Sequence, residues 1–238
     1  GMTTREDDAV QHLLVANTHD HLLFFTDRGR VFSQKALQVH GDFSRTSRGS
    51  PLSSLIKLVP GEKINAVLST PRLDTDGQFV MGTEKGEVKA LQFRALAKIR
   101  SNGLICMDLE DGDRLVSVRS CLKEDDIIIV TRNGQSIRFA SVQVPLRSRA
   151  AGGVRGIKLV GDDAVVGMEA ITPKDKLLVI SSQGKGKLMS MAKYPKQRRA
   201  GMGVKAFNVT RKTDRLVDAR VVQTGIEDEV MVVSQNSQ

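Results

Sequence analysis

The segment Ile127-Ile-Ile-Val-Thr-Arg-Asn-Gly134 decides the fold of this 238-residue chain. A run of apolar, mostly β-branched residues followed by a polar turn with glycine is typical of a strand that enters a β-hairpin. Glycine suits such a turn because it adopts a positive φ without steric cost. The same pattern returns at residues 22–29, 79–86 and 177–184, and it begins again at residues 230–237. The turn positions 29, 86, 134, 184 and 237 lie 57, 48, 50 and 53 residues apart, which indicates a repeated β unit.

Two further features recur in fixed order after each hairpin. An arginine shortly precedes a glycine at residues 45–49, 100–103, 149–153 and 199–203. A polar turn then leads into another apolar strand at residues 58–67, 109–118, 159–168 and 209–219. Each unit therefore offers about four short strands, and such units are typical of blades around an axis, so we predict an all-β, propeller-like fold. A β-sandwich with accidental spacing does not explain three features in the same order four times.

The repeats predict one domain rather than several. We expect residues 1–9 to be a tag remnant and polar lead-in, because Gly1 precedes Met2, and residues 10–238 to form a single domain. The approximate repeats are 10–70, 75–120, 125–171, 174–224 and a partial fifth at 227–238. Residues 90–99 are compatible with a helix, although a loop or strand fits the pattern better.

The composition narrows the classes of function. The net charge of +9 favours polyanionic partners, whereas an aromatic content of 4% argues against a surface that stacks unpaired bases. Cys106 and Cys121 form no CxxC pair, which fits buried thiols in a reducing cytoplasm. The sequence shows neither a signal peptide nor an apolar run near the 18 residues of a membrane span, so we expect no membrane partner.

Basic residues are concentrated in one part of every unit. Residues 28–48, 85–100, 132–158 and 185–205 hold 23 of the 36 lysines and arginines but only Asp42 and Glu87 among the 27 acids. Ordinary surfaces intersperse both signs, so this separation predicts a basic outer rim that grips DNA phosphates without reading bases. The predicted contacts are Arg28, Arg30, Lys35, Arg45, Arg48, Lys85, Lys89, Arg94, Lys98, Arg100, Arg132, Arg138, Arg147, Arg149, Arg155, Lys185, Lys187, Lys193, Lys196, Arg198, Arg199 and Lys205.

Catalytic and metal-binding patterns are missing from the sequence. Tyr194 is the single tyrosine, and its place before Pro195 favours packing or DNA contact over nucleophilic chemistry. No GxxxxGK[ST] loop and no nucleophile elbow occur, so we expect no catalytic residue. On a strand, His19 and His21 would point to the same face, but no cysteine or acid cluster completes a ligand set, so we expect no metal.

Several segments together resemble a known family. They are His12-Leu-Leu-Val-Ala-Asn-Thr-His-Asp20, Phe24-Phe-Thr-Asp-Arg-Gly-Arg-Val31, Ser44-Arg-Thr-Ser-Arg-Gly49, Gly153-Val-Arg-Gly-Ile-Lys158 and Tyr194-Pro-Lys-Gln-Arg-Arg199. In order and in type they resemble the C-terminal domain of bacterial DNA gyrase A, from about residue 10 to the end. The resemblance implies a β-pinwheel of six blades that exchange strands, with about four full repeats and part of a fifth present here.

The same resemblance implies a function and partners. The domain would wrap double-stranded DNA around its rim and support ATP-dependent negative supercoiling by a heterotetramer with the rest of gyrase A and with gyrase B. Catalysis, ATP and Mg would belong to those other parts, so this chain alone would be a non-enzymatic, cofactor-free and monomeric domain of a cytoplasmic, nucleoid-associated type II topoisomerase.

Two departures from the family pattern leave alternatives open. The family's QRRGGKG box is absent, and a degenerate counterpart, Gln197-Arg198-Arg199-Ala200-Gly201-Met202-Gly203, has alanine for a glycine and methionine for a basic residue. With the incomplete fifth repeat, this predicts a chain truncated at both ends. The alternatives are the equivalent C-terminal domain of topoisomerase IV, or a propeller that scaffolds protein partners.

Overall fold

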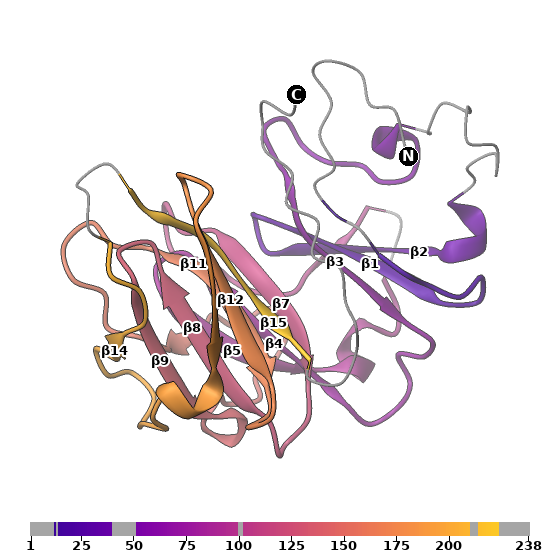
Figure 1. The fold of residues 1–238 in the computed structure, drawn as a ribbon. Helices are drawn as coiled ribbons and strands as arrows, with labels where there is room; N and C mark the ends of the chain where they lie inside the picture. The colour runs from indigo at the N-terminus through magenta and orange to yellow at the C-terminus, as the bar shows by residue number, and fades with distance from the viewer. Residues whose placement is uncertain (1–11, 13, 40–50, 100–101, 210–213, 224–238) are drawn as a thin grey trace.

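The chain folds into four antiparallel sheets, and the predicted all-β fold is confirmed (Figure 1). The structure is a computed structural model that describes residue 12 and residues 14–39, 51–99, 102–209 and 214–223. Three described sheets have four strands and the last has three. The predicted partial fifth repeat lies outside the described residues.

Each sheet is built on one of the predicted hairpins and the strand that follows it. The hairpins are β1 (His21–Thr26) with β2 (Arg30–Lys35), β4 (Gln78–Thr83) with β5 (Glu87–Gln92), β8 (Asp126–Thr131) with β9 (Gln135–Ala140), and β12 (Lys176–Ser181) with β13 (Gly186–Ser190). The turn glycines Gly29, Gly86, Gly134 and Gly184 have φ values of 72°, 90°, 87° and 74°, as predicted. The later strands of the four units, β3 (Ile64–Thr70), β7 (Leu115–Cys121), β11 (Val165–Ile171) and β15 (Leu216–Val222), pair with β1, β4, β8 and β12.

Neighbouring sheets exchange strands. The short strand after each arginine–glycine segment leaves its own unit and completes the preceding sheet: β6 (Leu104–Ile105) pairs with β2, β10 (Val154–Arg155) with β5, and β14 (Val204–Lys205) with β9. Each of these units therefore supplies strands to two sheets. This agrees with the strand exchange that the family resemblance implied.

The cores lie between successive sheets. β3 packs beside β7, β7 beside β11, and β11 beside β15, so the later strands form the inner side of the arrangement (Figure 1). Val, Ile and Leu fill the space between the second and third sheets, with Phe139 as the aromatic. All six residues of β8 are buried because sheets cover both of its faces. Continuous apolar runs such as Ile127–Val130 arise from this two-sided burial.

A 3-10 turn follows each hairpin, and after the second, third and fourth hairpins the chain then reaches the preceding sheet. These turns are η1 (Ala36–Gln38), η3 (Phe93–Leu96), η4 (Ser141–Gln143) and η5 (Met191–Lys193); a further turn, η2 (Leu52–Ser54), precedes β3. The open alternative for residues 90–99 is thus resolved, since β5 runs to Gln92 and η3 follows. After η4, Ala90 N donates to Pro145 O at 3.1 Å and Arg147 N donates to Ala90 O at 3.0 Å. The arginine–glycine segment of one unit therefore begins against the hairpin of the previous unit.

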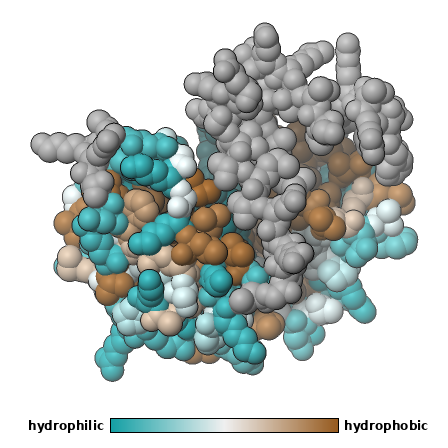
Figure 2. Space-filling model, viewed as in Figure 1, coloured by the Kyte–Doolittle hydropathy of each residue, from teal (hydrophilic) through white to brown (hydrophobic). Residues whose placement is uncertain are grey.

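Some exposed apolar side chains lie together on the surface. Figure 2 shows apolar side chains gathered over the region where β12 and β15 lie in Figure 1. Leu188 on β13 and Val217 on β15 are about half exposed. On the exchanged strands, the exposed residues Arg155 of β10 and Lys205 of β14 are cations.

Candidate nucleic-acid interface

The arginine–glycine loops and the exchanged strands form one continuous edge. The loop 147–153 contacts the segment after β6, where Asp108 N donates to Ala151 O at 3.2 Å and Arg149 Nη1 to Ile105 O at 3.5 Å. The loop 197–203 repeats this one unit later, where Lys158 N donates to Gly201 O at 2.8 Å. We call β6, loop 147–153, β10, loop 197–203 and β14 the outer edge. Its parts are hydrogen-bonded to one another, so neighbouring units hold the outer edge together.

Most of the predicted DNA contacts that the structure describes are exposed. Arg45, Arg48 and Arg100 lie outside the described residues. Thirteen of the other nineteen are exposed: Arg28, Lys35, Lys85, Arg94, Lys98, Arg147, Arg155, Lys185, Lys187, Lys193, Lys196, Arg198 and Lys205. Arg147, Arg155, Arg198 and Lys205 lie on the outer edge itself, so a duplex that follows this edge would meet a row of cations.

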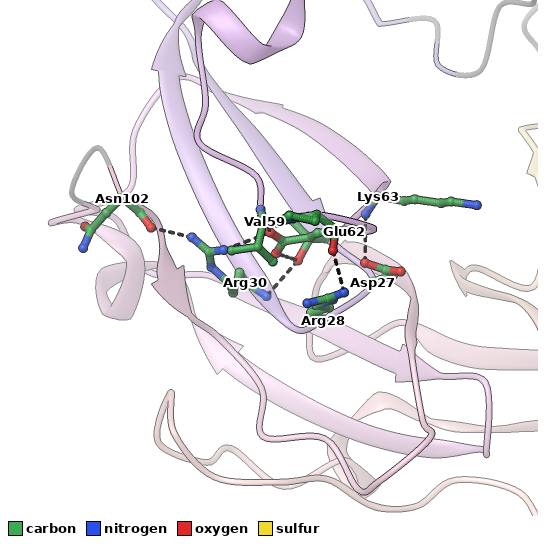
Figure 3. Close-up of polar contacts among 9 residues, drawn as sticks. Asp27, Arg28, Arg30, Val59, Glu62, Lys63 and Asn102 are labelled. Carbon is green, nitrogen blue, oxygen red and sulfur yellow. Dashed lines mark hydrogen bonds and ion pairs between the residues drawn. The ribbon is translucent and has the colours of Figure 1, made fainter.

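Partly buried arginines form hydrogen bonds between segments of the chain and also contribute positive charge. Arg30 donates to Glu62 Oε2 at 2.9 Å and to Asn102 O at 2.6 Å, so it joins the first hairpin to the approach to β6 (Figure 3). Its guanidinium also lies 4.8 Å from the centroid of the Phe32 ring. Arg199 Nε donates to Gln143 O at 2.9 Å, and Arg199 Nη1 donates to Arg155 O. Arg132 and Arg149 are likewise half-exposed.

Two predicted contacts are poorly placed to bind phosphate directly in this structure. The Lys89 side chain is fully buried, so it cannot reach a phosphate from this position. Only 11% of the Arg138 side chain is exposed, and it pairs with Asp126 at 2.8 Å and donates to the carbonyl of Met191 at 3.0 Å. Both side chains sit on second hairpin strands that the following unit covers. Sequence shows their charge, but it does not show that a segment about 60 residues later covers them.

Cations at the hairpin turns are paired within their own unit. Arg28 donates to Pro60 O at 2.9 Å (Figure 3), Lys85 donates to Asp111 O, and Arg132 donates to Asp162 O. These turns also contain acids, and Arg114 pairs with Glu84 at 2.8 Å. The hairpin-turn end is therefore partly neutralised, whereas loops 147–153 and 197–203 contain no acid.

The degenerate box adopts the backbone that glycine would favour. Ala200 has a φ of 72°, the only positive φ of a non-glycine residue among those described, and Gly203 has a φ of 74°. Gln197 N donates to Arg138 O at 2.7 Å, which anchors the start of the box on the preceding sheet. The departure from the family pattern at Ala200 thus falls at a position where alanine is strained.

One edge cation was not among the predicted contacts. Lys158 is exposed and follows β10, directly beside loop 197–203. The signal was present in the sequence, because Lys158 belongs to the basic stretch 132–158 and to the segment Gly153-Val-Arg-Gly-Ile-Lys158.

Tyr194 is a packing residue. It is 2% exposed in the core between the third and fourth sheets, and its hydroxyl lies 3.1 Å from Met189 Sδ. Burial raises the pKa of Tyr194 to about 12. Within the described part of the chain, no three His, Cys, Asp or Glu side chains are grouped to hold a metal, and no helix has the length and hydropathy needed to cross a membrane.

The fold and the edge together define a class: a strand-exchanged β-propeller with a basic outer edge. The family described as "DNA gyrase C-terminal domain, beta-propeller" matches residues 20–71, 78–121, 125–172 and 175–223, one match for each sheet. The chain belongs to this family.

Curated relatives agree with that membership. The chain is similar to the DNA gyrase A protein of Dehalogenimonas lykanthroporepellens, with 40% identity over 68% of this chain and 20% of the relative, and to that of Clostridium acetobutylicum, with 43% identity over 65% of this chain and 19% of the relative. The chain spans about a fifth of the length of these relatives.

The solved structures share the fold. The C-terminal domain of DNA topoisomerase IV has a TM-score of 0.81 at 24% identity, covering 93% of this chain and 69% of that one. The DNA gyrase A C-terminal domain has a TM-score of 0.55 at 20% identity, covering 85% of this chain and 82% of that one.

Proposed function

We propose that this chain binds duplex DNA without sequence specificity and bends it along the outer edge, as the wrapping domain of a DNA gyrase. The observation that carries the proposal is the continuity of the edge, where exposed Arg147, Arg155, Arg198 and Lys205 follow one another on interlocked segments. Phosphate contacts of this kind supply affinity and no base readout. A rigid curved row of cations offsets the elastic cost of bending DNA.

The path of the duplex follows from how the cations are paired. Arg28, Lys85 and Arg132 donate to carbonyls of turns that contain acids, whereas loops 147–153 and 197–203 contain none, so we expect these three to be weaker phosphate ligands than the edge cations. The path therefore runs over loops 147–153 and 197–203 rather than over the hairpin turns. Lys187 and Lys193, both exposed in the fourth unit, would extend this path.

The wider role belongs to the same proposal. Within a cytoplasmic, nucleoid-associated gyrase heterotetramer, this domain would present wrapped DNA to the rest of gyrase A and to gyrase B. ATP, Mg and catalysis would be supplied by those parts, and the isolated domain would be a monomeric, non-catalytic DNA-binding module.

Identity to relatives favours gyrase over topoisomerase IV. The curated relatives named above are gyrase A proteins at 40% and 43% identity, whereas the similarity to the topoisomerase IV structure, at 24% identity, is one of fold. The alternative of a scaffold for protein partners predicts a protein interface over the apolar face near Leu188 and Val217. A domain that binds no DNA would favour this alternative.

A relaxed-plasmid assay tests the proposal. The domain is bound to a relaxed, closed-circular plasmid, topoisomerase I relaxes the compensating supercoils, and the linking number is measured after the protein is removed. Wrapping shifts the topoisomer distribution in one direction, in proportion to bound protein. Binding without a shift would contradict wrapping, and no binding at low salt would contradict the proposal as a whole.

A further inference from the structure

Lys89 on β5 is a buried cation that direct DNA contact does not use. Its residue exposure is 0%, and its ammonium nitrogen lies 3.1 Å from Ser148 O, 2.9 Å from Arg149 O and 2.8 Å from Ala151 O. A protonated lysine has three N–H donors, and here each has a carbonyl acceptor. Burying a charge is costly unless it is fully hydrogen-bonded, so this arrangement makes the loop depend on the lysine.

All three acceptors belong to loop 147–153 of the outer edge. Arg147 folds onto the same loop, since its Nη1 donates to Gly152 O at 3.3 Å and Gly153 O at 3.1 Å. The loop has no regular strand of its own before β10. The ammonium group of Lys89 is therefore the point around which the loop closes.

We infer that Lys89 is a positioning residue for DNA binding, which acts by fixing loop 147–153 so that Arg147 and Arg155 face the duplex. The inference rests on the proposed function of the outer edge. A buried lysine on the preceding hairpin thus sets the orientation of two exposed arginines.

The third unit has no lysine at this place, since β9 carries Ile137 where β5 carries Lys89. Arg138 on β9 donates to Met191 O at 3.0 Å and Tyr194 O at 3.3 Å, and the carboxylate of Asp126 pairs with it. An arginine stays charged at every pH at which a protein is folded. Lys89, by contrast, has no carboxylate within ion-pair distance among the described residues, so backbone carbonyls alone hold its charge.

The charge on Lys89 is sensitive to mildly alkaline pH. Burial lowers the pKa of Lys89 to about 8, and the groups that face it are Cys106 and Asp108 after β6 and Arg147 and Arg149 on the loop. Burial raises the pKa of Cys106 to about 12, so this thiol stays neutral over the same range. A neutral amine donates only two N–H bonds to three carbonyls, so the loop loosens as pH rises through about 8.

Duplex affinity as a function of pH tests the inference. Fluorescence anisotropy with a labelled mixed-sequence duplex at constant ionic strength, between about pH 7 and about pH 9.5, should show a loss of roughly tenfold with a midpoint near pH 8, as expected for losing one or two phosphate contacts. Lys89→Met should show that loss already at neutral pH and no further change. Lys123→Met, which removes an exposed lysine outside the basic stretches, should keep the wild-type pH dependence.

Hydrogen exchange separates positioning from general destabilisation. In Lys89→Met at neutral pH, amides of loop 147–153 should exchange faster, while those of loop 197–203 should not change. If this variant does not fold, hydrogen exchange of the wild-type protein at mildly alkaline pH replaces it. Amides of loop 147–153 should then lose protection relative to those of loop 197–203. A flat wild-type affinity profile overturns the role of Lys89 but leaves the proposed function standing, whereas wild-type protein that binds no duplex overturns both.

Discussion

At Ala200 the backbone adopts a conformation that its side chain disfavours. The φ of 72° places it in the left-handed region, where a Cβ atom crowds the following carbonyl. The strain persists because Ala200 N donates to Gly156 O at 2.8 Å and the loop interlocks with the previous unit. Hydrogen bonding along the outer edge therefore holds Ala200 in a backbone conformation that alanine alone disfavours.

Replacing this alanine with glycine should stabilise the domain. Ala200→Gly removes the left-handed strain, and we expect the free energy of unfolding to rise by about 0.5–1 kcal/mol in urea denaturation. Ala150 has the corresponding place in the third unit without a positive φ. Ala150→Gly should lower stability by about 0.5 kcal/mol through chain entropy alone. Equal effects of the two substitutions would contradict the strain at Ala200.

At the scale of elements, hairpin turns that are alike in sequence differ in whether an exchanged strand of the next unit packs against them. Gly134 and Gly184 have the same turn position, with φ values of 87° and 74°. A Cβ on Gly134 would overlap the carbonyl oxygen of Phe207, which follows β14, whereas a Cβ on Gly184 meets no described atom within 4 Å. The exchanged strand of the next unit thus covers one turn and, within the described residues, leaves the other open.

The two glycines should therefore respond differently to alanine. Gly184→Ala should cost about 1 kcal/mol of stability, from the positive φ alone. Gly134→Ala should cost about 2 kcal/mol more, because the approach of Phe207 must also change. Chemical denaturation of both variants measures the difference in the free energy of unfolding. Similar losses of stability would show that the segment after the exchanged strand moves aside at little cost.

A buried ion pair joins the inner strands of neighbouring sheets. Arg119 on β7 donates to Glu169 on β11 through two bonds of 2.8 and 2.7 Å, and the two side chains are 20% and 4% exposed. Bidentate geometry satisfies both charges in a site with little solvent. The pair specifies which inner strands lie side by side.

Removing one partner should be costly. Glu169→Ala leaves Arg119 without its carboxylate, and we expect a loss of about 2–4 kcal/mol, less than for a fully buried pair because Arg119 keeps some solvent. Asp74→Ala breaks the exposed pair with Arg72 and should leave the melting temperature unchanged. If Arg119→Met with Glu169→Leu were no more stable than Glu169→Ala, an orphaned charge would not be the cause.

At the scale of the whole molecule, the outer edge places one residue from each exchanged strand in equivalent positions. Arg155 of β10 and Lys205 of β14 are exposed cations, and the equivalent residue of β6 is Ile105, which is 55% exposed. The row of cations therefore has a gap at its beginning.

The salt dependence of DNA binding should depend on the number of cations in this row. Arg155→Gln with Lys205→Gln should reduce the slope of log K against log salt by about 2, because each phosphate contact contributes about 0.9. Ile105→Arg should increase the slope by about 1 and tighten binding, since it fills the gap. Titrations of one duplex at several salt concentrations measure both, and slopes that stay at the wild-type value would exclude the exchanged strands from the DNA path.

Much of the site was predictable because charge and turn chemistry are local properties. The hairpins, the positive φ of their glycines and the exposed cations of the arginine–glycine loops are where the sequence pattern placed them. The burial of Lys89 and Arg138 was not predictable, because it depends on segments that lie 53 to 59 residues later in the chain. Alternation along β5 gives no warning, since Val88, Lys89 and Ala90 are all buried.

The sequence by itself determined the repeated hairpin, the number of described sheets and the basic part of each unit, because turn geometry and apolar runs act over a few residues. Only the tertiary structure decided how one unit's strand completes another unit's sheet, and which cations face solvent. Those outcomes depend on pairing between segments far apart in the chain. Lys89 is stable away from water because three backbone carbonyls converge on it, whereas Arg138 also has the carboxylate of Asp126 as a partner.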